Sequence, residues 1–502
     1  YSVNAEPCAP KLATIDWYEK NNGGRLPEND GLLSGGLPCV VDAWYTLLDR
    51  WGTMSFGEVL QPAIELAESG FPLSERGVAF ILQTEKIHKY PTTAKIYLPN
   101  GKPPKPSEIF KNRDLASTLE TLIEIEKKNK GKGRHDALKA ARDHFYKGDL
   151  ARNMATFSEE NGGLFRYEDF AEYSVQIETP VSIDYHGYTV YKNPSASQGP
   201  TELIALNLLE GYDLRALGHN SADYIHTCVE AIKLAMADRE IFLGDMDFIA
   251  IPYEKLLSKG YACERRPLID PHKASLELRP GTTDATVNRV GNATAPEQLA
   301  ANTGSTDNSD TSYIAVVDKD RNMVSFEPSL HSPFGTGVVM GDTGIIFNCR
   351  GDYYSLIRGE ANALEPGKRP RSTLQSSLVM KNGEPFLITG SPGTDDQVMR
   401  TMQTLLNIVD FGMNVQQAIE APRWSSRAFP ASPFPHTMYP GDLSVEARIP
   451  VATQQSLIAR GHKLRIDPPW SLGSNAAIVV NSENGVLEAG ADPRVEAYAW
   501  AW

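Results

Sequence analysis

The feature that most constrains this chain is a junction where a polar stretch runs directly into a β-hairpin. Residues 304–310 contain no large apolar side chain, so this stretch cannot offset the entropy lost on ordering by burying surface. Residues 313–317 are β-branched, aromatic or small, and residues 319–322 form a polar turn before a second strand at 323–326. Thr311 is therefore predicted to lie between an accessible strip and a rigid sheet.

This position of Thr311 allows two interpretations. A peptide bond in an accessible strip is suited to being cut, and a cut just before Thr311 leaves a threonine whose α-amine can act as the base for its own hydroxyl. Threonine is also simply common at the start of strands, where its β-branched side chain is favoured. The local pattern by itself leaves both interpretations open.

Composition and charge exclude several classes of function. The 502 residues carry a formal net charge of −14 without a dominant basic face, which disfavours nucleic acid as a partner because its phosphates are anionic. The one basic cluster, residues 127–134, is typical of a solvated loop that closes a helix. No run of apolar residues approaches the roughly 18 needed for a membrane span. We therefore expect a globular protein that is too long for a single small core.

The five cysteines form no metal or disulfide pattern. They are Cys8, Cys39, Cys228, Cys263 and Cys349. Without a Cys-x-x-Cys pair or a histidine at ligand spacing, neither a metal site nor another cofactor is expected. An odd, unpatterned set is also more typical of a reducing compartment such as the cytoplasm. The sequence begins at Tyr1 without a charged and apolar leader, so we expect the native start to lie upstream, which leaves export open.

The order of the predicted elements indicates a layered α+β protein. Helical periodicity dominates the first half, most clearly at 40–51, 56–69, 201–210 and 220–244. Strand patterns dominate the second half, at 313–317, 323–326, 378–380, 386–390, 477–480 and 486–489. Between the halves, the polar stretch 271–310 predicts a linker or mobile tail. Helices followed by strands suit an α+β or layered sandwich better than a doubly wound sheet.

A second candidate nucleophile, Ser391, is excluded by its neighbours. The strand, turn and helix around it resemble a hydrolase nucleophile elbow, but Thr389 stands where the elbow needs glycine. Pro392 also lacks the backbone N–H that is needed just after the nucleophile. Gly393 and Thr394 still present N–H groups at a helix N-terminus, where negative charge is favoured. The loop is either an oxyanion hole or an ordinary strand-to-helix turn.

Several short motifs occur in a characteristic order and spacing. They are residues 52–54, 64–71, 209–214, 311–320, 334–337, 367–373, 390–393 and 407–412. Together they resemble the γ-glutamyltranspeptidase family over essentially the whole chain. The resemblance implies a four-layer αββα sandwich of the N-terminal-nucleophile hydrolase type, made as a precursor that cuts itself between Asp310 and Thr311. The large subunit (1–310) and the small subunit (311–502) are then expected to form one catalytic domain, in a compartment that family precedent extends to the periplasm or outside the cell.

The resemblance also implies roles for individual residues. The new N-terminal threonine attacks an amide, and water or an acceptor amine resolves the resulting acyl-enzyme. An α-amine has a reference pKa of about 7.7–8.0, which suits a general base. Ser329 takes the place of the family's second threonine, whose hydroxyl assists the nucleophile. Gly393 matches the first oxyanion glycine, while Thr394 replaces the second and keeps a backbone N–H to donate.

The substrate-binding positions depart from the family. An arginine near the start, which in the family grips the α-carboxylate of the glutamyl group, aligns with Ile15. The positions matching the asparagine, glutamine or glutamate, and aspartate that hold the α-amine in the family are His331, Arg350 and Tyr353. A substrate ammonium would meet repulsion at Arg350. Ser372 and Thr373, which match the family's hydroxyl pair at the carboxylate, are retained.

These departures lead to one main hypothesis and two alternatives. The chain is predicted to hydrolyse a small-molecule amide whose acyl group lacks the α-amine and ends in a carboxylate held by Arg350, with Ser372 and Thr373 assisting. Arg350 could instead form a structural ion pair, for example with Asp352. The first alternative function is a true γ-glutamyl hydrolase or transpeptidase. The second is an uncut binding homologue without catalytic activity.

Overall fold

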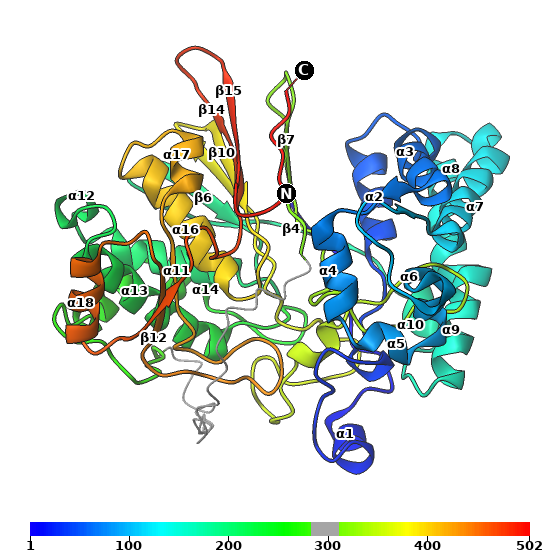
Figure 1. Cartoon of the computed structure of the whole chain (residues 1–502), viewed down its shortest axis with the longest axis horizontal. Coiled ribbons are helices and arrows are strands. Elements are labelled where there is room, and N and C mark those ends of the chain that lie inside the picture. Colours follow the sequence, from blue (N-terminus) through cyan, green and yellow to red (C-terminus); the bar gives the residue numbers. More distant parts are fainter. Residues whose placement is uncertain (283–310, 502) are drawn as a thin grey trace.

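The computed structural model in Figure 1 describes residues 1–282 and 311–501. A helical N-terminal lobe, which contains α2 to α9, forms one side of the molecule (right in Figure 1), and the main sheet with α11, α13 and α16 forms the other. The predicted cleavage point at Asp310 and residues 283–310 of the predicted tail lie outside the described residues. Every helix that the structure describes is too short or too polar to cross a membrane.

The main sheet has six antiparallel strands in the order β15-β14-β10-β9-β6-β5. Its strands are β5 (Val181–Tyr185), β6 (Tyr188–Lys192), β9 (Ser377–Lys381), β10 (Glu384–Gly390), β14 (Ala476–Val480) and β15 (Leu487–Ala491). A tight turn joins β9 to β10, where Asn382 and Gly383 have φ of 52° and 81°. Positive φ at both central residues is typical of a type I′ turn. Both halves of the chain contribute strands to this sheet.

Two helices cover one face of the sheet, and a third helix packs on one of them. They are α11 (Gly199–Leu209), α13 (Ala222–Phe242) and α16 (Asp396–Val409). Helix α11 contacts β5 and β6, α16 contacts β10, and α13 packs on α11. All of α11 and most of α13 are buried. Such all-round burial is characteristic of a helix in the core of a large protein.

The N-terminal lobe is built from helices that pack side by side. They are α2 (Val40–Arg50), α3 (Phe56–Ser69), α7 (Arg113–Asn129), α8 (Arg134–Lys147) and α9 (Asp149–Glu160). Helix α3 begins at a capping box formed by Ser55 and Glu58. The buried Glu126 carboxylate of α7 also accepts hydrogen bonds from the N–H groups of Phe56 (3.0 Å) and Gly57 (2.9 Å). These bonds satisfy donors at the helix start that have no partner within the helix.

The remaining elements are short and connect these parts. The helices are α1 (Ile15–Asn21), α4 (Glu75–Gln83), α5 (Lys86–Lys89), α6 (Pro91–Tyr97), α10 (Tyr167–Ala171), α12 (Leu214–Leu217), α14 (Tyr253–Leu256), α15 (Lys259–Arg265), α17 (Val415–Glu420) and α18 (Val451–Ala459). Strand β1 (Ser2–Asn4) pairs with β4 (Gln176–Glu178), and β2 (Phe71–Pro72) pairs with β3 (Ile109–Phe110). A small sheet joins β11 (Trp424–Ser425), β12 (Asp442–Glu446) and β13 (Lys463–Asp467).

The hairpin of β7 (Ile314–Val317) and β8 (Met323–Phe326) is a second β layer. It packs against the six-stranded sheet, where β8 contacts β10 and β7 contacts β14. The approach is close, because a Cβ atom at Gly390 would lie 2.2 Å from the ring of Tyr313. Only glycine fits there. The two strands predicted for this hairpin are confirmed to within one residue.

Residues 271–282, the described part of the predicted tail, are docked on α13. The N–H of Gly281 donates to the Asp238 carboxylate (2.7 Å), and Arg279 pairs with Glu230 (3.0 Å). This differs from the mobile tail predicted for the stretch. The order comes from buried acids on α13, which lie far away in the sequence and leave no trace in the composition of the stretch itself.

Candidate active site

The structure places the hydroxyl groups of Thr311 and Ser329 side by side. Ile314 pairs with Phe326 in the hairpin, and continuing the antiparallel register sets Thr311 opposite Ser329 in an isolated β-bridge. Their hydroxyl oxygens are 2.9 Å apart. The backbone N–H of His331 also donates to the Ser329 hydroxyl oxygen (3.0 Å). Ser329 can therefore accept one hydrogen bond while giving its own proton to Thr311.

The predicted substrate-binding residues are also brought together. Nη1 of Arg350 donates to the Ser372 hydroxyl (3.0 Å), and the Tyr353 hydroxyl lies 3.1 Å from the Thr373 hydroxyl. Arg350 and Tyr353 lie in one 3-10 turn (Arg350–Tyr353), and the guanidinium stacks 5.4 Å from the Tyr353 ring centroid. The edge of the His331 ring meets the same tyrosine at 4.4 Å between centroids. These five side chains are all buried.

Arg350 is only partly satisfied by its surroundings. Its Nη2 is buried without a hydrogen-bond partner among the described residues, and so is Oε2 of Glu6. The two side chains form a long ion pair, in which Nε of Arg350 lies 3.8 Å from Oε2 of Glu6. Asp352, considered as a structural partner for Arg350, instead lies 3.6 Å from Nδ1 of His331 and accepts the Asn29 N–H (3.2 Å). One edge of the guanidinium is thus left for another anion.

Burial and charge set the protonation states around this group. Burial lowers the pKa of His331 well below its usual value, and Arg350 and Lys86 lower it further, so the imidazole is neutral. Burial lowers the pKa of Arg350, but the charges of Glu6 and other nearby groups raise it by more. The pKa of Arg350 is therefore raised. Burial raises the pKa of Cys349, beside His331, to about 12. A neutral imidazole therefore lies beside the cationic guanidinium of Arg350.

The loop between β10 and α16 has the form expected of an oxyanion hole. Gly393 and Thr394 have φ of 122° and 47°, and within the described part of the chain their N–H groups donate to no acceptor. A Cβ atom at Gly393 would lie 1.9 Å from Nη1 of Arg400, which itself donates to the Pro392 carbonyl (2.6 Å). Nε2 of Gln198 ties the Thr394 carbonyl (3.2 Å) to the neighbouring Thr373 carbonyl (2.6 Å). The loop is therefore held by contacts on several sides, and it leaves two N–H donors for a ligand.

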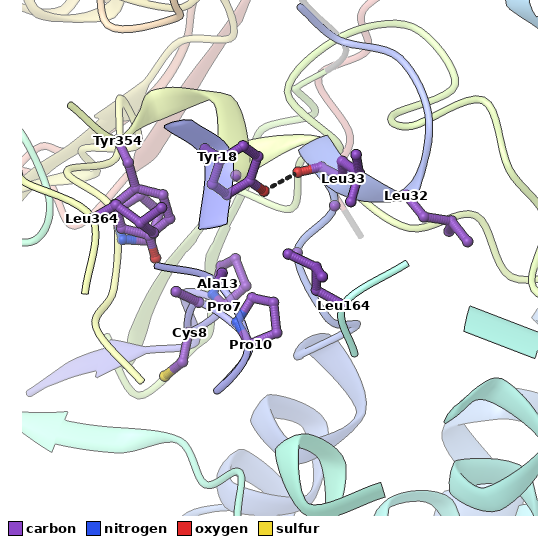
Figure 2. Close-up of a pocket in the computed structure, with 15 residues that line it drawn as sticks. Pro7, Cys8, Pro10, Ala13, Tyr18, Leu32, Leu33, Leu164, Tyr354 and Leu364 are labelled. Carbon is purple, nitrogen blue, oxygen red and sulfur yellow. Dashed lines mark hydrogen bonds between the residues drawn. The ribbon is translucent and has the colours of Figure 1, made fainter. Parts of the chain in front are cut away.

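Sequence reasoning missed one residue that faces the predicted substrate-binding group. Ile15 packs in an apolar cluster with Ala13, Tyr18 and Leu26, whereas the side chain of the N-terminal segment that faces Arg350 is Glu6. Figure 2 shows the apolar pocket beside this segment, where the Tyr18 hydroxyl donates to the Leu33 carbonyl (2.8 Å). Its free volume of about 10 Å³ leaves room for roughly one water molecule, so it is not a substrate pocket.

Two buried groups in the described residues have the donor atoms of a metal site. They are His226, Glu230 and His462, and His331, Cys349 and Asp352. In the first group Glu230 is already paired with Lys233 and Arg279. In the second group, the positive charges of Arg350 and Lys86 are close enough to lower the pKa of His331. Neighbouring cations repel a metal ion, so we assign neither group as a metal centre.

Comparisons with known proteins decide the family. A sequence profile described as Gamma-glutamyltranspeptidase matches residues 1–502. The chain belongs to the γ-glutamyltranspeptidase family. The glutathione hydrolase-like YwrD proenzyme of Bacillus subtilis (strain 168) is 36% identical over 501 residues, which cover 98% of this chain and 85% of the relative.

Two solved structures are similar to this γ-glutamyltranspeptidase family member along its whole length. The structure of LmbA2991HD has a TM-score of 0.91 and 33% identity, covering 100% of this chain and 87% of the other. The cephalosporin acylase from Bacillus halodurans has a TM-score of 0.83 and 28% identity, covering 100% and 84%.

These comparisons confirm the predicted fold class and enzyme class. The structural neighbours have the N-terminal-nucleophile hydrolase fold, which is α+β as predicted. Members of the γ-glutamyltranspeptidase family are amide hydrolases and acyltransferases that are made as self-cutting proenzymes. This chain is an enzyme of the same amide hydrolase and acyltransferase class.

Proposed function

We propose that the chain cuts itself between Asp310 and Thr311 and that the freed Thr311 is the nucleophile. The pairing of the Thr311 and Ser329 hydroxyls at 2.9 Å supports this proposal. In turnover the Thr311 oxygen bonds to the acyl carbon while its proton passes to the α-amine and then to the leaving amine, as the C–N bond breaks. Ser329 donates to the attacking oxygen, and the N–H groups of Gly393 and Thr394 stabilise the charge that develops on the carbonyl oxygen. Water then releases the acid by the same steps.

The two pieces produced by the cut, 1–310 and 311–502, are proposed to form one catalytic domain. Strands β5 and β6 come from the first piece, and β9, β10, β14 and β15 come from the second. Backbone hydrogen bonds between β6 and β9 join the pieces within a single sheet. The pieces are therefore expected to stay together after the cut.

The acyl group is proposed to end in a carboxylate and to lack an ammonium in the position where the family binds one. The unpartnered Nη2 of buried Arg350, beside the Ser372 hydroxyl, is the observation that carries this proposal. A carboxylate satisfies such a guanidinium edge with charge-assisted hydrogen bonds. Neutral His331 adds no negative charge that could attract an ammonium. The family includes a relative named as a cephalosporin acylase, so acyl groups other than γ-glutamyl are within its range.

Glu6 supports a second candidate, a γ-glutamyl group held with its charges exchanged. Its unpartnered Oε2 could receive an ammonium while Arg350 receives the carboxylate. The resemblance places an ammonium site where Arg350 now stands, so the two charged groups would have traded places around the α-carbon. Exchanging the positions of the ammonium and the carboxylate on the α-carbon converts an L amino acid into a D amino acid. This candidate therefore predicts a D-γ-glutamyl amide.

A comparison of three anilides with one leaving group tests both candidates. We expect kcat/KM for glutaryl p-nitroanilide to exceed that for the L-γ-glutamyl compound by at least about 10-fold, because the ammonium of the latter meets Arg350. The leaving group is common to all three, so the ratio reports acyl recognition alone. Preference for the L-γ-glutamyl anilide would refute the proposed acyl group, and preference for the D enantiomer would favour the Glu6 candidate.

A further inference from the structure

We propose that Glu327 is a positioning residue whose carboxylate fixes the catalytic segments relative to one another. Glu327 directly follows β8 and is buried. Its Oε2 accepts the backbone N–H of Gln375 at 2.7 Å, and the backbone N–H of Ser391 lies near enough to the carboxylate to favour its ionised form. One side chain thus holds two other segments of the chain.

Each of these three anchor points lies two residues from a group placed in the chemistry. Ser329 follows Glu327, Thr373 precedes the Gln375 contact, and Gly393 follows the Ser391 contact. A shift of about 1 Å in such groups is enough to slow a reaction by about 100-fold. The carboxylate is therefore well placed to set the distance between the nucleophile pair, the acyl-binding hydroxyls and the oxyanion loop.

A buried polar network connects Gln375, the partner of Glu327, to the main sheet and to two helices. The side chain of Gln375 accepts from Lys192 on β6 and donates to the Thr401 hydroxyl on α16 (2.9 Å). Lys192 is fully buried and pairs with Glu202 on α11 at 2.5 Å. The segments that Glu327 joins are thus held against the sheet and the two helices behind it. Displacement of the carboxylate would be transmitted to the catalytic segments.

The carboxylate is retained at a cost in stability. Burial raises the pKa of Glu327 to about 7, against the backbone hydrogen bonds and the charges of Lys192 and Arg350. The charge of Glu327 also helps to raise the pKa of the Tyr313 phenol, at the start of the hairpin. Oε1 is buried without a partner among the described residues. Because the pKa in the folded state is raised, the stability that the protonated form gives is full below about pH 4.5 and is lost as the pH rises through about 7.

Protonation has the opposite effect on function. The ionised carboxylate attracts both N–H groups strongly, whereas the neutral acid is a weaker acceptor and gains a proton that the buried surroundings do not bind. The catalytic segments are therefore held best when Glu327 is ionised. Activity falls as the pH is lowered through about 7, in addition to any loss caused by protonation of the Thr311 α-amine.

The slope of the acid limb of the pH profile tests this inference. It rests on the proposed Thr311 nucleophile, but it applies to whichever acyl anilide the enzyme turns over, so its failure is distinct from failure of the acyl assignment. Below about pH 6.5 we expect log kcat/KM of the mature wild-type enzyme to fall with a slope of two, since two groups must be ionised or deprotonated. Glu327→Gln should show a slope of one and about 100-fold lower kcat at pH 8.

Glu126→Gln is the matched control, because Glu126 is also a buried carboxylate that accepts two backbone N–H groups, in the N-terminal lobe. It should keep the slope of two. The unfolding temperature of Glu327→Gln should rise relative to that of the wild type as the pH is raised from 5 to 8. A wild-type slope of one, or a slope of two in Glu327→Gln, would overturn the inference. If Glu327→Gln does not fold, the wild-type slope decides alone.

Discussion

Replacing Thr311 with alanine is expected to leave the chain as a single uncut band on a denaturing gel and to lower turnover by at least about 10⁴-fold. The substitution removes the oxygen that attacks both the Asp310–Thr311 bond and the substrate amide. The β-bridge to Ser329 is made by the backbone and survives, so the hairpin should still fold. The bands on the gel after incubation measure self-cutting, and the release of the aniline from the substrate measures turnover.

Two variants separate the loss of chemistry from the loss of structure. Thr311→Ser keeps the hydroxyl and should retain cutting and measurable turnover. Ser312→Ala changes the exposed neighbouring residue, whose backbone N–H keeps its bond to the Pro328 carbonyl (2.9 Å), and should leave both activities intact. Cutting or turnover in Thr311→Ala would refute the nucleophile. A wild-type chain that stays uncut on incubation would instead favour the silent binding homologue.

Local features of the fold were predictable from the sequence. The hairpin at 313–326 depends on β-propensity, a polar turn and period-two packing, all of which are contained in fourteen consecutive residues. The turn at Asn382 and Gly383 depends on the two residues that adopt positive φ. The burial of α13 was not predictable, because it depends on α11 and the sheet, and the helix has no single face to reveal it.

The candidate site was predictable only in part, and for a related reason. Thr311 and Ser329 are joined by hairpin register, so local pattern brings them together. Glu6 and Arg350 are more than three hundred residues apart, and only the fold reveals that they face one another. Glu327 likewise has no signal of its own, since its partners are backbone N–H groups.

The second large effect is expected at Arg350. We expect Arg350→Gln to lower kcat/KM for glutaryl p-nitroanilide by about 100-fold, mostly through a higher KM, because a buried charge-assisted interaction with the carboxylate contributes about 2–3 kcal/mol. Butyryl p-nitroanilide has the same leaving group without the carboxylate, and its kcat/KM should change by less than about threefold. The comparison of the two substrates isolates the contact between guanidinium and carboxylate from general damage to the site.

The charge left behind on Glu6 determines the control variants. Removing Arg350 alone leaves the Glu6 carboxylate buried without its cation, which by itself can destabilise the fold. The double variant Glu6→Gln/Arg350→Gln removes both charges and should show the same selective loss with less loss of stability. Arg358→Gln removes an exposed arginine that is paired with Asp16 and Glu19. It should leave kcat/KM for both anilides unchanged. An equal loss on glutaryl and butyryl anilides in the double variant would show that Arg350 is structural, and the acyl group would then have to be recognised by the hydroxyl groups of Ser372, Thr373 and Tyr353 alone.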